Sequence, residues 1–129
     1  MLRAAPNALH PQLAYTKTKF LYSFFHARAA QIMSIKDGEE NPFIYILMPM
    51  AATSDIVFQA MLAFSGVVYE QQYSAAFASA TWEHYAQAIR SLKHTLTHFV
   101  QDQVDRGTEL LATVLLLLSL EVIRIPPFM

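Results

Sequence analysis

The chain has no cysteine, only three glycines and few charged side chains among its 129 residues. Without cysteine, disulfide bonds, thiolate zinc sites and thiol nucleophiles are all excluded. Glycines as far apart as Gly38, Gly66 and Gly107 cannot form the glycine-rich loop that cradles a phosphate group. Charged residues make up 15% of the chain and hydrophobic residues 54%. Because disordered chains combine low hydrophobicity with high charge, this composition excludes overall disorder.

Positive charge is present but is not gathered into a patch. The nine lysines and arginines are scattered, and the formal net charge is −1. A protein that binds DNA needs a basic surface to neutralise phosphates, so we predict no direct contact with nucleic acid. The first twenty residues also lack the apolar segment of a secretory signal and the repeated arginines of a mitochondrial presequence.

Hydrophobic residues recur at steps of three and four through most of the chain, which is the period of an amphipathic helix. This pattern predicts an all-α fold, an irregular array of about five helices. We place them at about 12–35, 43–50, 56–69, 76–101 and 108–123. The chain length fits one domain spanning residues 1–129. We expect residues 1–11 to be flexible and residues 124–129 to form an atypical C-terminal tail.

Several residues mark the expected helix boundaries. Asn41 can cap free backbone N–H groups, and Pro42 suits the first helical position. Pro49 is expected to kink or end the helix that follows. Ser54, within Thr-Ser-Asp, gives a second capping signal. Residues 101–107, which end at Gly107, are predicted to form a charged turn, and Thr108 can cap the last helix.

The helix at 76–101 has one apolar face, which consists of Trp82, Tyr85, Ile89, Leu92, Leu96 and Phe99. The opposite face is polar and consists of Glu83, Gln87, Arg90, His94, His98 and Gln101. We predict that the apolar face contributes to the core, chiefly through Trp82, Tyr85, Ile89 and Leu92.

The sequence contains a few candidate catalytic and metal-binding groups. His94, His98 and Asp102 recur at four-residue spacing, which could place three metal ligands on one helix face. That face is opposite the apolar one, and spacing alone is weak evidence, so we favour an ordinary solvated surface. His84 and Tyr85 are adjacent and would not face each other in a helix. We therefore predict a protein that is not an enzyme, with no catalytic, cofactor-binding or metal-binding residue and no cofactor.

Two apolar segments, 56–69 and 110–123, raise the alternative of a small membrane-associated helical protein. Each is shorter than the roughly 20 residues that a membrane span needs, and Glu121 lies inside the second. We favour buried helices for both. Segment 110–122 is apolar on every side and must be surrounded, but the four helices predicted before it can hardly surround it. The many aromatic and methionine residues favour core packing, with a ligand cavity between helices as the alternative.

Five short motifs in order resemble a known family, the fungal-specific transcription factor domain. These motifs are Asn41-Pro42-Phe43, Met48-Pro49-Met50, a Ser-led helix over 56–68, His84-Tyr85 with 88–92, and Leu110 to Thr113 continuing to Glu121-Val122. The family usually has proline after the serine, where this chain has Asp55. The resemblance implies an all-helical regulatory region of the kind found downstream of a binuclear zinc-cluster DNA-binding domain.

The chain departs from this family in two ways. The six cysteines of the zinc cluster are missing, so that module cannot be assigned here. The family also continues with further helices after the segment that matches Glu121-Val122, whereas this chain ends seven residues later. We therefore expect a truncated member of the family.

The resemblance implies a non-catalytic regulatory module in the nucleus. Such a module would act by binding a protein partner or a small-molecule effector, without touching DNA. Self-association through an exposed apolar helix is a further expectation. The alternative function is the membrane-associated protein that would use 56–69 and 110–123.

Overall fold

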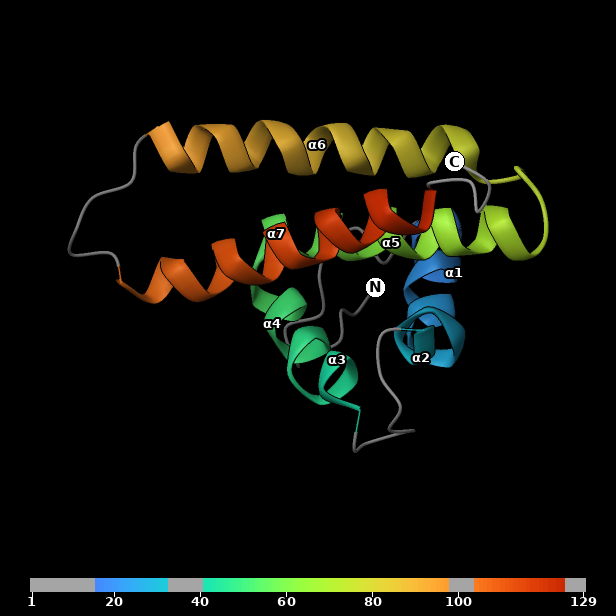
Figure 1. Ribbon diagram of the computed structural model, residues 1–129, viewed down its shortest axis with the longest axis horizontal. Helices are drawn as coiled ribbons and strands as arrows, with labels where there is room; N and C mark the ends of the chain where they lie inside the picture. Colours follow the sequence, from blue (N-terminus) through green and yellow to red (C-terminus); the bar gives the residue numbers. More distant parts are fainter. Residues whose placement is uncertain (1–15, 33–40, 98–103, 125–129) are drawn as a thin grey trace, which may run out of the picture.

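The computed structural model describes residues 16–32, 41–97 and 104–124, with the backbone alone for 104–106. Within these ranges the regular elements are all helical, which confirms the predicted all-α fold (Figure 1). In chain order they are α1 (Thr16–Phe24), the π-helical turn η2 (Phe25–Ala29), α2 (Ala30–Ile32), α3 (Pro42–Tyr45), α4 (Leu47–Thr53), α5 (Asp55–Gln72), α6 (Ala78–Thr97) and α7 (Val104–Arg124).

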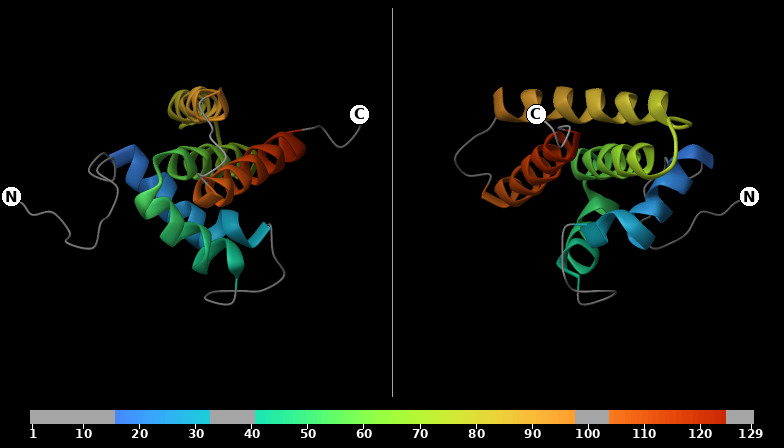
Figure 2. Two further views of the ribbon diagram at one scale, coloured as in Figure 1. Left: turned by 90° about the vertical axis from the view of Figure 1, so that its left-hand side faces the viewer. Right: turned by 45° about the vertical axis from the view of Figure 1, so that its right-hand side comes forward.

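Helix α5 is the centre of the fold. It contacts α1, η2, α4, α6 and α7, and every residue from Ile56 to Val68 is buried. Figure 2 shows α5 in the middle, with α6 along one side and the segment from α1 to α4 on the opposite side. A helix that is apolar all round must be enclosed on all sides, so the composition of α5 accounts for its central place.

The predicted cap at Asn41 is confirmed, and it also joins two parts of the chain. Its side-chain oxygen accepts a hydrogen bond from the backbone N–H of Phe43 at 2.8 Å. Its amide nitrogen donates to the backbone oxygen of Ala30 at 3.0 Å. Asn41 is fully buried, and Pro42 occupies the first turn of α3. The cap therefore holds the end of the first helical segment against the start of the next.

Pro49 does not end a helix in the way the sequence predicted. The break falls three residues earlier, at Ile46, and Pro49 lies in the first turn of α4. A proline fits there because the first N–H groups of a helix have no partner within it. The second predicted cap is confirmed, since the Ser54 hydroxyl accepts from the N–H of Val57 at the start of α5.

The last helix begins earlier than predicted. We expected it to start at a Thr108 cap, but α7 begins at Val104 and includes Gly107. A glycine costs a helix only about 1 kcal/mol relative to alanine, which is too little to end one. Gly107 is also unobstructed, because an added β-carbon would meet nothing within 4 Å among the described residues.

The sides of α6 agree with the sequence prediction over most of the described part of this helix, but Leu96, predicted on the apolar face, is 56% exposed. Its apolar residues Trp82, Tyr85, Ile89 and Leu92 are partly buried against the core. On the other side Glu83 and His94 are exposed. His98 and Gln101, which the prediction also put on the polar side, lie outside the described residues.

Helices α5 and α6 approach closely at Gly66. An added β-carbon there would overlap the Thr81 hydroxyl and lie 2.7 Å from the Thr81 Cβ. Both residues are fully buried. The missing side chain of Gly66 therefore makes room for Thr81, and this sets how closely α6 packs on the central helix.

Candidate functional site

The predicted alternative of a metal site has only one of its three residues in the described part of the chain. His94 is exposed on α6, and His98 and Asp102 lie outside it. Among the residues that the structure describes, there is no cluster of three metal-ligating side chains. The assignment of no metal-binding, cofactor-binding or catalytic residue remains a prediction from the sequence.

The membrane alternative finds no support in the described helices. None of them combines the length and the hydropathy that a transmembrane span requires. The two apolar segments behind that alternative lie in α5, which is central, and in α7, which packs along it.

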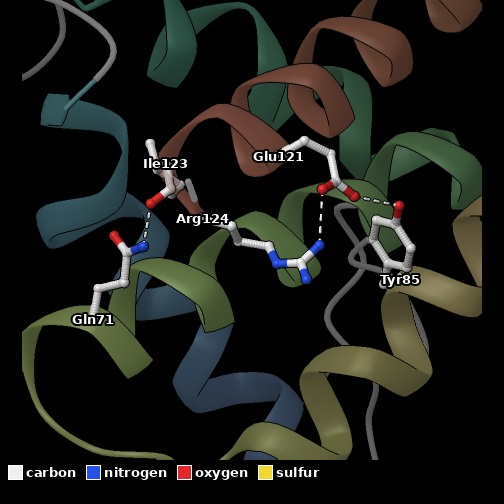
Figure 3. Close-up of polar contacts among 5 residues, drawn as sticks. All are labelled: Gln71, Tyr85, Glu121, Ile123 and Arg124. Atoms are coloured by element: carbon white, nitrogen blue, oxygen red, sulfur yellow. Dashed lines mark hydrogen bonds and ion pairs between the residues drawn. The ribbon is translucent and has the colours of Figure 1, made fainter. Parts of the chain in front are cut away.

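A polar cluster joins α6 to α7 (Figure 3). The Tyr85 hydroxyl donates to the Glu121 carboxylate at 2.6 Å, and the Arg124 guanidinium pairs with the same carboxylate at 2.8 Å. The Arg124 guanidinium also lies 4.8 Å from the centre of the Trp82 ring, a cation–π distance. Hydrogen bonding to the Glu121 carboxylate, followed by burial, raises the pKa of the Tyr85 hydroxyl. Tyr85 is thus a core residue with its hydroxyl at the edge, as predicted.

A second contact near this cluster ties α7 to the end of α5. The side-chain amide of Gln71 donates to the backbone oxygen of Ile123 (Figure 3). This oxygen belongs to the last turn of α7, where backbone carbonyls lack helical partners. Together with the Tyr85–Glu121 bond, it fixes the C-terminal end of α7 against both neighbouring helices.

A row of polar groups crosses the interface between α5 and α6. The Gln59 amide nitrogen donates to Asp55 at 3.2 Å, and the Gln59 oxygen lies 2.7 Å from Nδ1 of His84. Because an amide oxygen only accepts, the His84 Nδ1 carries the proton. Burial lowers the pKa of His84, and the nearby carboxylates of Glu83 and Asp55 oppose this. His84 is therefore a neutral donor at pH 7, which satisfies a polar group inside an apolar interface.

A polar cleft of about 490 Å³ opens where α4 meets α5, beside α6 and α7. Its lining residues are Thr53, Ser54, Asp55, Ile56, Arg90, Ser91, His94, Thr95 and Glu109. The Ser54 hydroxyl donates to the Glu109 carboxylate at 3.0 Å and so links α5 to α7 at the cleft wall. With the Arg90 guanidinium and two carboxylates at its edge, the cleft has the groups to bind a small polar molecule.

The outer side of α7 is apolar and exposed, as expected of an apolar helix that the helices before it cannot surround. Leu116 and Leu120 face α5 and are fully buried. On the outer side lies what we call the α7 face, which consists of Leu111, Val114, Leu115, Leu118 and Val122. The exposed fractions of Leu111 and Leu118 reach 71% and 61%. The helix that is enclosed on all sides is α5, because α6 packs on α5 and leaves the outer side of α7 uncovered.

A groove of about 380 Å³ runs along part of the α7 face. It is lined by Ile32, Phe43, Phe64, Leu115, Leu118, Ser119, Val122 and Ile123. All but Ser119 are apolar. An exposed apolar patch of this kind on a water-facing surface marks a site of protein contact or ligand binding.

The partners in these contacts were not predicted from the sequence. Gln59 stands inside an apolar run, and Glu121 interrupts another. Each proves to be a polar partner for a residue of α6. A polar residue that interrupts an apolar helix is the signal that could have found them, because burial requires such a group to be hydrogen-bonded.

Comparison with known proteins supports the family resemblance. Searches of curated proteins and of solved structures found no match to the chain. A comparison with protein-family models matched residues 20–124 to the fungal specific transcription factor domain. This match covers most of the chain and runs from α1 to the end of α7. The chain therefore belongs to the family of fungal-specific transcription factor domains, and its role is in transcription regulation.

Proposed function

We propose that this chain is a non-catalytic regulatory module that works in the nucleus by binding another protein, without contacting DNA. The observation that carries the proposal is the α7 face. Its side chains are large, apolar and adjacent, and burying an aliphatic side chain contributes about 1.5–3 kcal/mol. A partner that covers this face gains that energy. The nuclear location follows from the family alone.

The charge distribution supports a role in protein contact over a role in DNA contact. The net charge of the chain is −1, and its basic residues are scattered. On α7, Arg124 is paired with Glu121 and lies over the Trp82 ring. Scattered basic residues do not supply the row of phosphate contacts on which DNA affinity depends.

A transcription assay tests this proposal. The chain is fused to an unrelated DNA-binding domain, and the output of a reporter gene is compared with that of two variants. Leu118→Glu places a charge in the middle of the α7 face and is expected to change the output several-fold. Leu96→Glu is the matched control, because Leu96 is 56% exposed on α6, away from that face. Equal output from the parent and both variants would contradict the proposal.

The polar cleft supports a second candidate function, the binding of a small effector. Its volume of about 490 Å³ lies within the range of small-molecule sites. The matched pair of variants is Ser91→Trp, which fills the cleft, and Ser74→Trp, at an exposed position outside it. Native mass spectrometry of the purified chain should show a bound small molecule that Ser91→Trp loses and Ser74→Trp keeps. A chain that carries no bound molecule would leave protein binding as the function.

A further inference from the structure

The α7 face has the spacing of a helix–helix seam. Leu111, Leu115, Leu118 and Val122 follow one another at steps of four, three and four residues. This is the seven-residue repeat by which two helices pack side by side. None of the four is charged, so nothing along the seam opposes close approach of a second apolar helix.

The two ends of the seam complement each other. Leu111, at one end, is 71% exposed and is not part of the groove. Val122, at the other end, lines the groove together with Leu118. If a second α7 lies antiparallel, Leu111 faces the partner's Val122, and Leu115 faces the partner's Leu118. Each copy then offers a projecting leucine to the groove of the other, which is the reciprocal arrangement that two-fold symmetry requires.

The exposed area of the α7 face sets the size of such a contact. At about 30 Å² for each aliphatic side-chain carbon, the exposed fractions of its five residues correspond to roughly 300 Å² of apolar surface. Two copies would bury about 600 Å² of apolar surface, and homodimer interfaces are about 65% apolar, so the whole contact would reach about 900 Å². That area is below the range of stable, specific interfaces and indicates a weak dimer.

We infer that the partner of the α7 face is a second copy of this chain, and that two α7 helices pair antiparallel about a two-fold axis. The inference rests on the proposed use of this face for protein contact and names the occupant. In this pairing Leu111 lies opposite the partner's Val122, and by symmetry the same contact occurs at each end of the seam. Its centre lies between Leu116 and Leu117.

Cysteine cross-linking tests the register, and the chain has no natural cysteine to interfere. The double variant Leu111→Cys/Val122→Cys should form a covalent dimer under mild oxidation. The reason is that the thiol at position 111 of one copy lies opposite the thiol at position 122 of the other copy. The single variants Leu111→Cys and Val122→Cys should remain unlinked. In the proposed dimer, identical positions are about 16 Å apart along the axis, given a rise of 1.5 Å for each residue. A disulfide needs Cα atoms within about 7 Å.

Sedimentation velocity over a range of concentrations tests the dimer itself. The parent chain should change from monomer to dimer as its concentration rises through the micromolar range. Leu118→Glu should raise the dissociation constant at least tenfold, while Leu96→Glu should leave it unchanged. Circular dichroism of each variant checks that the helices are intact, and Leu115→Lys is a second disrupting variant.

Three results would overturn the inference. The first is a parent chain that remains monomeric at every concentration. The second is an oligomer that Leu118→Glu and Leu115→Lys leave unchanged. The third is cross-linking of a single-cysteine variant as efficient as that of the double variant. If the chain is monomeric but Leu118→Glu still changes the reporter output, the dimer is disproved and the proposed function is kept. If the chain dimerises but Leu118→Glu leaves the reporter output unchanged, the dimer is kept and the proposed function is disproved.

Discussion

Among single residues, Gly66 has the most specific steric role. Its position lies under Thr81, so Gly66→Ala would force α5 and α6 apart or shift the Thr81 side chain. We expect a loss of about 1–3 kcal/mol in the free energy of unfolding, as for other overpacked cores. Gly107→Ala is the matched control and should stabilise by up to about 1 kcal/mol, since it adds a helix-favouring residue where space is open. Chemical denaturation of both variants measures the difference.

A double variant identifies the cause of the Gly66→Ala effect. Thr81→Ala removes the atoms that the new β-carbon would overlap, and also a buried hydroxyl without a hydrogen-bond partner in the described structure. Gly66→Ala/Thr81→Ala should therefore be more stable than Gly66→Ala alone. If the double variant shows the simple sum of two losses, the clash with Thr81 is not the cause.

His84 should make the stability of the fold depend on pH. Its pKa in the folded chain lies below the ordinary value of 6.5, chiefly because the ring is buried. The unfolded chain therefore binds the proton more readily, and stability falls as the pH drops from about 6.5 to the folded pKa. Above pH 7 the ring is neutral in both states, so this contribution is constant. Urea unfolding between pH 8 and pH 5 measures the slope.

The variant His84→Asn isolates this contribution. Its side-chain amide can still donate to Gln59, but it does not titrate. The pH slope near 6.5 should be shallower in the variant, while the slope from the carboxylates at lower pH remains. Identical slopes in the parent and in His84→Asn would show that His84 is not the group responsible.

At the scale of helices, the contact of α6 with α7 depends on a few polar side chains. These two helices meet through Tyr85 and Glu121, and each packs mainly on α5. We expect Tyr85→Phe to lower the free energy of unfolding by about 0.5–1.5 kcal/mol, the usual value for one hydrogen bond. A double-mutant cycle with Glu121→Ala, which removes the acceptor, measures the coupling. Additive losses would contradict a direct interaction between the two side chains.

The boundaries of the helices show which local signals can be read from a sequence. The caps at Asn41 and Ser54 were predicted, because each needs only one side chain and a nearby N–H. Pro49 and Gly107 misled the prediction. Both residues lie in the first turn of a helix, where proline and glycine are tolerated. A proline or glycine in the sequence therefore does not by itself show whether a helix begins there or ends there.

Over the whole molecule, the central place of α5 determines where stability is greatest. Its backbone is enclosed along Ile56 to Val68, so its amide hydrogens should exchange only when the whole fold opens. We expect hydrogen exchange in dilute solution to be slowest there and faster in α7, whose outer side faces water. Equal protection of α7 under conditions where the chain is monomeric would contradict this arrangement.

The candidate sites were less predictable than the fold. The groove brings Ile32 and Phe43 beside Leu118, and the polar cleft brings Ser54 and Arg90 beside Glu109. These residues lie far apart in the sequence, and no local pattern pairs them. Two motifs that carried the family resemblance contain residues that hold neighbouring segments together. Asn41 is hydrogen-bonded to Ala30, and Glu121 is hydrogen-bonded to Tyr85.

The sequence by itself determined the helical fold, two of its caps, the apolar face of α6 and the family, because each depends on residues close together in the chain. Only the tertiary structure decided which of two apolar helices is enclosed. Both 56–69 and 110–122 are hydrophobic enough to be central. Helix α5 takes the centre because Gly66 lets α6 approach it closely while α1, α4 and α7 pack on its other sides. The apolar outer side of α7 is left facing water.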